Sequence, residues 1–311
     1  MAETTQVTKG VNGILASLGA RVGSWARRRI VWLLVAPALI LVLGYITVPM
    51  LFMVRMSFYV RERLEVYQPG TFTIDNYARF ADSFLIRTTF DTLWYSAVIL
   101  TATLLLGYPI SYMLTRTRSK WRPLLLAMVI APFMISVAVS AYGWLTLLSG
   151  NGPINWVLKM FPFWPDGVRM ANTPLGGLIA MSVTFIPFMV LPLVSSLSSI
   201  DRNLEEASTN LGANPVQTFF RVVFPLSLPG LMGGSVLVII IALTSFVTPR
   251  IVGGPGMSML GVDIYNNTIV YLNWPQGAAV GIVLTVVVVL VFLLLGQTLR
   301  SQFLEEERAQ Q

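Results

Sequence analysis

Six apolar runs, with no ionisable side chain well inside any of them, constrain this chain more than any other feature. The hydrocarbon core of a bilayer is about 30 Å thick, and an α-helix crosses it with roughly 20 residues. A backbone inside the bilayer must also satisfy its own hydrogen bonds. The sequence therefore predicts an all-α, polytopic membrane bundle with six transmembrane helices. The predicted spans are residues 31–54, 92–115, 123–148, 173–197, 228–252 and 276–299.

The composition supports this class and excludes several kinds of chemistry. The 311 residues are 55% hydrophobic and 11% charged, whereas a soluble domain carries about 25% charged residues. The chain has no cysteine and no histidine, so it lacks thiolate chemistry, disulfides and the commonest metal ligand and general base. We expect no catalytic residue, no metal site and no enzymatic activity.

The distribution of basic residues predicts the topology. A cluster at residues 27–29 precedes the first run, and residues 116–122 contain Arg116, Arg118, Lys120 and Arg122 with no acid. Cytoplasmic segments are enriched in Lys and Arg, so both segments are predicted to be cytoplasmic. The net charge of +7 then reflects topology, and we expect no nucleic-acid partner.

The predicted domain organisation follows from this topology. Six spans place both termini in the cytoplasm. The first run is too long for a signal peptide, and no small-residue cleavage site follows it. We expect a cytoplasmic tail at residues 1–29, a six-span transmembrane domain at residues 30–300 and a cytoplasmic tail at residues 301–311.

The interior of the spans argues for a path without its own energy source. Buried ionisable residues are typical of proton relays and ion-coupled transport. Because the spans have no ionisable residue well inside them, an ion-coupled secondary transporter is the weaker alternative. A membrane-embedded enzyme or scaffold is a third, weakened by the missing bases. Proline and glycine within the spans favour a bundle with an internal path, although plain kinked packing explains them equally well.

A polar interruption at residues 200–230, called the docking loop below, separates the fourth and fifth runs. Its first part predicts a short helix because Leu204, Ala207, Ser208 and Leu211 lie at i, i+3, i+4 and i+7, on one helix face. Gly212 follows where a left-handed C-terminal cap is expected.

The second part of the docking loop predicts another short helix. Asn214 is a suitable N-cap, and Pro215 suits the first helical position. Pro225 and Pro229 are expected to end this helix and lead back to the membrane. A loop built from two helices joined by a glycine is suited to docking a partner. The chain has no G-x-x-x-x-G-K-[ST] phosphate loop, so if transport is driven, we expect its energy to come from another polypeptide.

The spacing within the docking loop resembles the signature of the permease subunits of binding-protein-dependent ABC importers. That signature reads E-A-A, three residues, G, nine residues and I-x-L-P. Here Glu206-Ala207-Ser208 is followed at the same spacing by Gly212 and by Val222-x-Phe224-Pro225. Segments such as FTIDNYARF, LGYPISYMLTR, FVTPRIVGG and NWPQGAAVGIVL are similar to the spermidine/putrescine branch of the family.

This resemblance implies a type I ABC importer permease fold in the bacterial inner (plasma) membrane. It implies three partner classes besides the lipid bilayer: a second permease subunit, two ATP-binding cassette ATPase subunits and a periplasmic substrate-binding protein. ATP and Mg²⁺ would be bound by the ATPases, with no cofactor on this chain. Glu206 would be the exposed charge that pairs with a basic group on the ATPase. The residues implied in ATPase coupling are Glu205, Glu206, Ala207, Ser208, Leu211, Gly212, Asn214, Pro215 and Pro225.

The resemblance also suggests a polyamine such as spermidine or putrescine as the solute. Aromatic faces and a few acceptors would bind such a cation. The branch often has an arginine where this chain has Ser140, which leaves another small organic solute as the alternative. Packing or interfacial anchoring is the plainer role for each aromatic residue. The candidate path residues are Trp94, Tyr95, Ser140, Tyr142, Trp144 and Phe246, and the nearest outward acids are Asp91 and Asp263.

Overall fold

The computed structural model describes residue 32 and residues 35–61, 67–81, 83–117, 119–161 and 167–309, with side chains for all of these except 81 and 298–309. The predicted tail at residues 1–29, residues 310–311 and Arg118 lie outside the described residues. The chain divides into two compact units, Met1–Arg55 and Met56–Gln311. Apart from one isolated bridge between Val60 and Gln68, the regular structure of the described residues is helical, which confirms the all-α prediction.

Within the described residues, five helices are long and apolar enough to cross a membrane, and a strongly bent pair makes a sixth candidate. The first candidate is Val35–Met56, close to the predicted 31–54, and all of it except Met56 belongs to the first unit. The other four unbroken candidates are Ser83–Arg116, Pro174–Ser199, Pro215–Thr244 and Trp274–Gln297.

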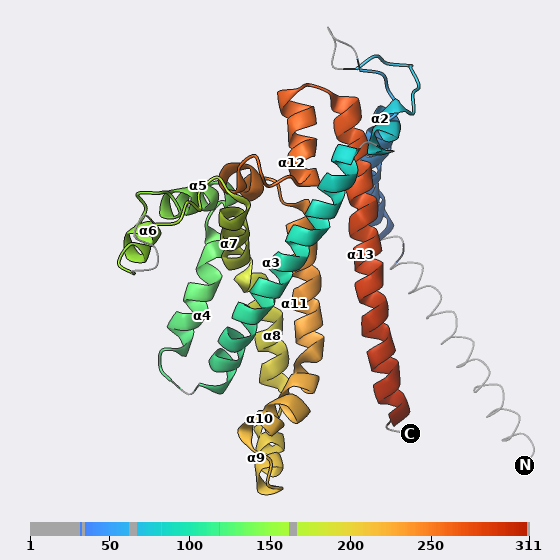
Figure 1. The fold of residues 1–311 in the computed structure, drawn as a ribbon. Helices are drawn as coiled ribbons and strands as arrows, with labels where there is room; N and C mark the ends of the chain where they lie inside the picture. The colour runs from blue at the N-terminus through green and yellow to red at the C-terminus, as the bar shows by residue number, and fades with distance from the viewer. Residues whose placement is uncertain are drawn as a thin grey trace, which may run out of the picture. The chain divides into compact units, whose positions relative to one another are not determined.

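The second unit is a helical bundle whose elements Figure 1 labels. Its last helix continues past residue 300. In chain order the elements are α2 (Asp75–Ala78), η1 (Arg79–Ala81), α3 (Ser83–Arg116), α4 (Arg122–Ile130), η2 (Ala131–Met134), α5 (Val137–Leu147), α6 (Pro153–Leu158), α7 (Pro174–Thr184), α8 (Ile186–Ser199), α9 (Arg202–Asn210), α10 (Pro215–Thr218), η3 (Phe219–Val223), α11 (Phe224–Thr244), η4 (Pro249–Gly253), α12 (Leu260–Tyr265), η5 (Asn266–Val270) and α13 (Trp274–Ala309).

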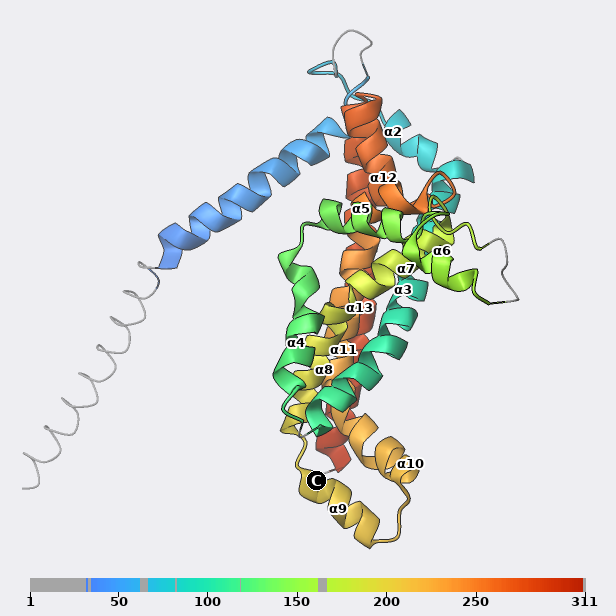
Figure 2. The ribbon, with the colours of Figure 1, turned by 90° about the vertical axis from the view of Figure 1, so that its left-hand side faces the viewer.

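Helices α3, α8 and α11 form the closely packed centre of this unit (Figures 1 and 2). Met189 of α8 is fully buried between them. A Cβ atom added to Gly107 of α3 would lie 2.9 Å from Met189 Cγ, and one added to Gly234 of α11 would lie 2.8 Å from Met189 Sδ. Small residues let membrane helices approach closely, so these two glycines make room for the methionine.

The third predicted span, residues 123–148, is wrong as a single straight helix. The segment Arg122–Met134 is bent by 107° from Val137–Leu147. Pro132 lies in the 3₁₀ turn η2, and Ile135 and Ser136 after it are extended. Proline supplies no N–H and its ring obstructs a continuing helix, so the chain turns here and α5 takes a new direction.

The prediction that Pro225 and Pro229 end the second loop helix is also wrong. Helix runs without a break from Pro215 to Thr244. The turn η3, which ends two residues before Pro225, is π-helical, and the Phe224 N–H donates to the Phe219 carbonyl. The extra residue in this turn shifts the hydrogen-bond register, which accommodates a proline inside the helix.

The far end of the fifth predicted span, residues 228–252, is wrong as well. Helix α11 ends at Thr244, and Ser245 is extended. Pro249 then begins the separate π-helical turn η4. The apolar run therefore exceeds the helix, because apolar composition alone does not mark a helix end.

The glycine packing leads to a stability prediction. In Gly234→Ala the new Cβ would meet Met189 Sδ at 2.8 Å and the Met189 carbonyl oxygen at 3.1 Å. Overpacking of this kind costs about 1–3 kcal/mol, so the apparent unfolding temperature of the purified protein should fall. Gly233→Ala is the matched control, because its Cβ would meet only Pro192 Cβ at 3.8 Å. Equal unfolding temperatures for the two variants would contradict this packing.

Candidate functional site

The first helix of the docking loop, α9, has a defined start and a defined end. The Asp201 carboxylate accepts a hydrogen bond from the Asn203 N–H at 3.0 Å. At the other end Gly212 has φ +88°, its N–H donates to the Thr209 carbonyl, and the Ala213 N–H donates to the Ser208 carbonyl. This is a Schellman C-cap, so the predicted left-handed C-terminal cap at Gly212 is confirmed.

The second helix, α10, begins as predicted at Asn214 and Pro215. The Asn214 side chain accepts from the Gln217 N–H at 2.8 Å, and the Gln217 side chain accepts from the Asn214 N–H at 3.0 Å. Sequence reasoning missed Gln217, although a cap residue followed three positions later by Gln signals such a capping box. Both ends of the turn between the two helices are therefore fixed by local hydrogen bonds.

One face of α9 borders a hollow of about 470 Å³ between the two loop helices. Leu204, Ala207, Ser208 and Leu211 all line it, which confirms that they share a face. The Ser208 hydroxyl forms a hydrogen bond of 3.0 Å with the Thr218 hydroxyl of α10. Ser208 thus joins the two loop helices.

The docking loop projects from one end of the bundle, and α12 and α2 lie at the opposite end (Figures 1 and 2). The C-terminal end of α13 lies at the same end as the loop. Glu206 is exposed, and the apolar Leu211, Val216 and Phe220 are 89%, 63% and 62% exposed. Neighbouring exposed apolar residues on a projecting loop are typical of a protein interaction surface. The cytoplasmic location of this end stays a prediction.

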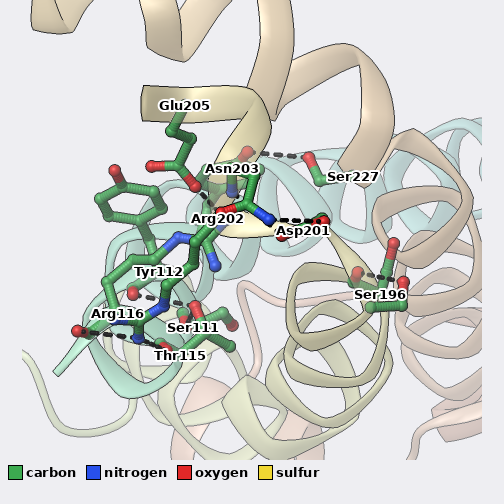
Figure 3. A network of polar contacts seen from close by, with 12 residues as sticks. Ser111, Tyr112, Thr115, Arg116, Ser196, Asp201, Arg202, Asn203, Glu205 and Ser227 are labelled. Atoms are coloured by element: carbon green, nitrogen blue, oxygen red, sulfur yellow. Dashed lines mark hydrogen bonds and ion pairs between the residues drawn. The ribbon is translucent and has the colours of Figure 1, made fainter. Parts of the chain in front are cut away.

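Glu205 differs from its neighbour Glu206. Its carboxylate forms an ion pair with the Arg116 guanidinium at the end of α3, and the two side chains are only 21% and 16% exposed. Figure 3 shows the pair beside Tyr112. Glu205 therefore lies against its own chain, and Arg116, interpreted from sequence only as a topology signal, belongs to the same site.

Five of the candidate path residues lie on α3 and α5. Trp94 is 58% exposed, and the Tyr95 hydroxyl donates to the Gly256 carbonyl at 3.4 Å. On α5, Ser140 is half-buried and Tyr142 is 60% exposed. The fifth, Trp144, donates from its indole N–H to the Thr184 hydroxyl at 3.1 Å. The candidates thus lie on separate elements.

The sixth candidate, Phe246, lies in the break after α11 and stacks on Tyr265 with ring centroids 5.6 Å apart. The Arg250 guanidinium lies 4.4 Å from the centre of the Tyr265 ring on which Phe246 stacks. Asp263 is near in sequence, on α12. Burial raises the pKa of its carboxyl group, opposed by hydrogen bonding from Asn267. This segment therefore combines aromatic rings with a desolvated acid, whose ionised form a nearby cation would stabilise.

Comparison with known proteins identifies the family. Residues 104–302, which include the whole docking loop, match the family described as binding-protein-dependent transport system inner membrane component. The chain belongs to this family. The match runs from within α3 to within α13, so the central helices and the loop are those of an ABC importer permease.

Relatives of this permease are found in the polyamine branch. The spermidine/putrescine transport system permease protein PotB of Haemophilus influenzae is 33% identical over 246 residues, which are 79% of this chain and 86% of the relative. PotB of Escherichia coli is 33% identical over 249 residues, 80% of this chain and 90% of the relative. The predicted resemblance to that branch is confirmed.

A solved structure shows the same fold. One chain of a bacterial alginate ABC transporter, crystallised with a pentasaccharide-bound periplasmic protein, superposes with a TM-score of 0.69 at 21% identity. The superposition covers 88% of this permease and 95% of that chain. The likeness confirms the predicted permease fold.

Proposed function

We propose that this permease forms the path of an ATP-driven importer for a polyamine such as spermidine or putrescine. The observation that carries the proposal is the 33% identity to PotB over 79% of this chain, whose name states that solute. Phe246 and Tyr265, with Asp263 between them in the sequence, are suited to a polyamine because cations bind to aromatic faces and carboxylates. Ser140, at the position where the branch often has arginine, keeps another small organic solute as the second candidate.

The docking loop is the proposed contact with the ATPases. Its projection from the bundle, the exposed Glu206 and the exposed Leu211 support this role. ATP and Mg²⁺ are assigned to the ATPase subunits, and this chain is assigned no cofactor and no catalytic step.

The proposed assembly contains this chain, a second permease subunit, two ATP-binding cassette ATPases and a periplasmic binding protein. In it both termini and the docking loop face the cytoplasm, and α12 and the Phe246 segment face the periplasm. The binding protein delivers the solute at the outer end while the ATPases act at the inner end. The location of the docking loop and α12 at opposite ends of the bundle supports this arrangement.

Reconstitution tests the proposal directly. Proteoliposomes containing this chain, its co-purifying partners and the binding protein should take up labelled spermidine with ATP, and not with a non-hydrolysable ATP analogue. Uptake by the isolated chain without ATP would contradict the proposal in favour of an ion-coupled transporter. ATP-driven uptake of a different solute by the complex would contradict only the polyamine assignment.

Two variants test the docking loop. Glu206→Ala removes the proposed charge contact, and Gly212→Pro removes both the left-handed conformation and the N–H that binds Thr209. Both should separate ATP hydrolysis from uptake while the spans stay inserted. Gly212→Asn is the matched control, because asparagine adopts the left-handed region more readily than other side chains. Normal ATP-driven uptake by Glu206→Ala and Gly212→Pro would rule out the coupling role.

A further inference from the structure

Two arginines join the docking loop to the end of α3, a helix to which the loop is not adjacent in sequence. Arg116, the last residue of α3, forms the ion pair with Glu205 of α9. Arg202, the first residue of α9, donates from Nη2 to the Thr115 carbonyl at 3.1 Å and to the Arg116 carbonyl at 3.3 Å. Each helix therefore contributes an arginine to the other (Figure 3). We call Arg116, Arg202 and Glu205 the clasp.

The clasp agrees with the electrostatics of both helix ends. The last carbonyls of a helix have no partner within it and carry partial negative charge. Arg202 binds two such carbonyls of α3. Glu205 lies in the first turn of α9, where partial positive charge favours a carboxylate. Charge pairing and helix capping thus stabilise the same contact.

An aromatic row extends the contact along α3. Tyr108, Tyr112 and Arg116 are four residues apart and lie on one helix face. The Arg116 guanidinium lies 5.9 Å from the centre of the Tyr112 ring, and Tyr112 meets Phe219 of η3 edge-on at 5.7 Å. Tyr108 meets the same phenylalanine at 5.6 Å. Helix α3 therefore contacts both helical parts of the loop.

The covalent connections of α9 are weaker constraints by comparison. On one side Ile200 and Asp201 are extended, and on the other Gly212 makes the turn. The hydrogen bonds of the Gly212 turn and the Ser208–Thr218 hydrogen bond join α9 only to α10, so they would not by themselves prevent α9 from tilting away from α3. The clasp opposes that tilt, because separating Arg116 from Glu205 would leave two largely buried charges without partners.

We propose that Arg116, Arg202 and Glu205 are positioning residues that lock α9 to α3, so that a displacement of α9 moves α3 together with α8 and α11. The proposal rests on the docking role of the loop. It assigns Glu205 a different role from Glu206: Glu206 faces the ATPase, and Glu205 transmits the displacement of α9 to the bundle.

The first test measures ATP hydrolysed per spermidine transported by the reconstituted complex. Arg116→Gln and Glu205→Gln should each raise this ratio at least about fivefold, within the usual range of coupling between sites. The double variant should raise the ratio no further than either single variant does, because the two residues act as one unit. Defective assembly would instead lower hydrolysis and transport together.

Arg87→Gln is the matched control. Arg87 also pairs with an acid on α3, at 3.9 Å from Asp91, but at the opposite end of the helix and with its side chain 84% exposed. Such a pair contributes little, so the ratio should stay at the wild-type value. If Arg116→Gln and Glu205→Gln both show wild-type uptake and a wild-type ratio of ATP hydrolysed to spermidine transported, the proposed role of the clasp is wrong and the proposed function is unaffected.

A second measurement tests whether the clasp holds α9 to α3 and needs no transported solute. It therefore applies even if the wild-type complex does not take up spermidine. The chain has no native cysteine, which allows spin labels at Asn210→Cys on α9 and Leu105→Cys on α3, both exposed. The distance distribution between the labels should be narrow with the clasp intact and should broaden in Arg116→Gln and Glu205→Gln. Identical distributions would overturn the proposal.

Discussion

Met189 contacts glycine positions on two neighbouring helices at once, and the rest of the second unit depends on this close approach. Without a Cβ on Gly107 or Gly234, the α8 backbone can lie near both α3 and α11. Hydrophobicity alone does not select partners inside a bilayer, so packing and hydrogen bonds must do so. The methionine and its two glycines supply that selection at the centre of the bundle.

The docking loop extends this packed centre beyond the bundle. The loop is covalently continuous with α8 and α11, and the clasp and the aromatic row bind it to α3. All three central helices therefore connect to the docking loop. The π-helical turn η3 is part of this arrangement, because it carries the helix past Pro225 and presents Phe219 to Tyr108 and Tyr112.

Local chemistry made part of this structure predictable. Gly212, Asn214 and Pro215 act through residues within four positions, so their roles could be inferred from sequence. The effects of Pro132 and Pro225 could not, because a proline can either bend a helix or be accommodated by a π turn. Arg202 binds Thr115 across 87 residues of sequence, and no periodicity predicts such a contact. The sequence therefore does not separate Glu205, which pairs with Arg116 of its own chain, from the exposed Glu206.

In the proposed importer, α9 and the central helices move as one body when the ATPases act. The most direct measurement bridges Arg116→Cys and Glu205→Cys with a reversible bifunctional thiol reagent in the assembled complex. If the two sites never separate during the cycle, the bridged complex will keep ATP-driven uptake. Loss of uptake on bridging, restored when the bridge is reduced, would show that α9 must part from α3 and would contradict the account.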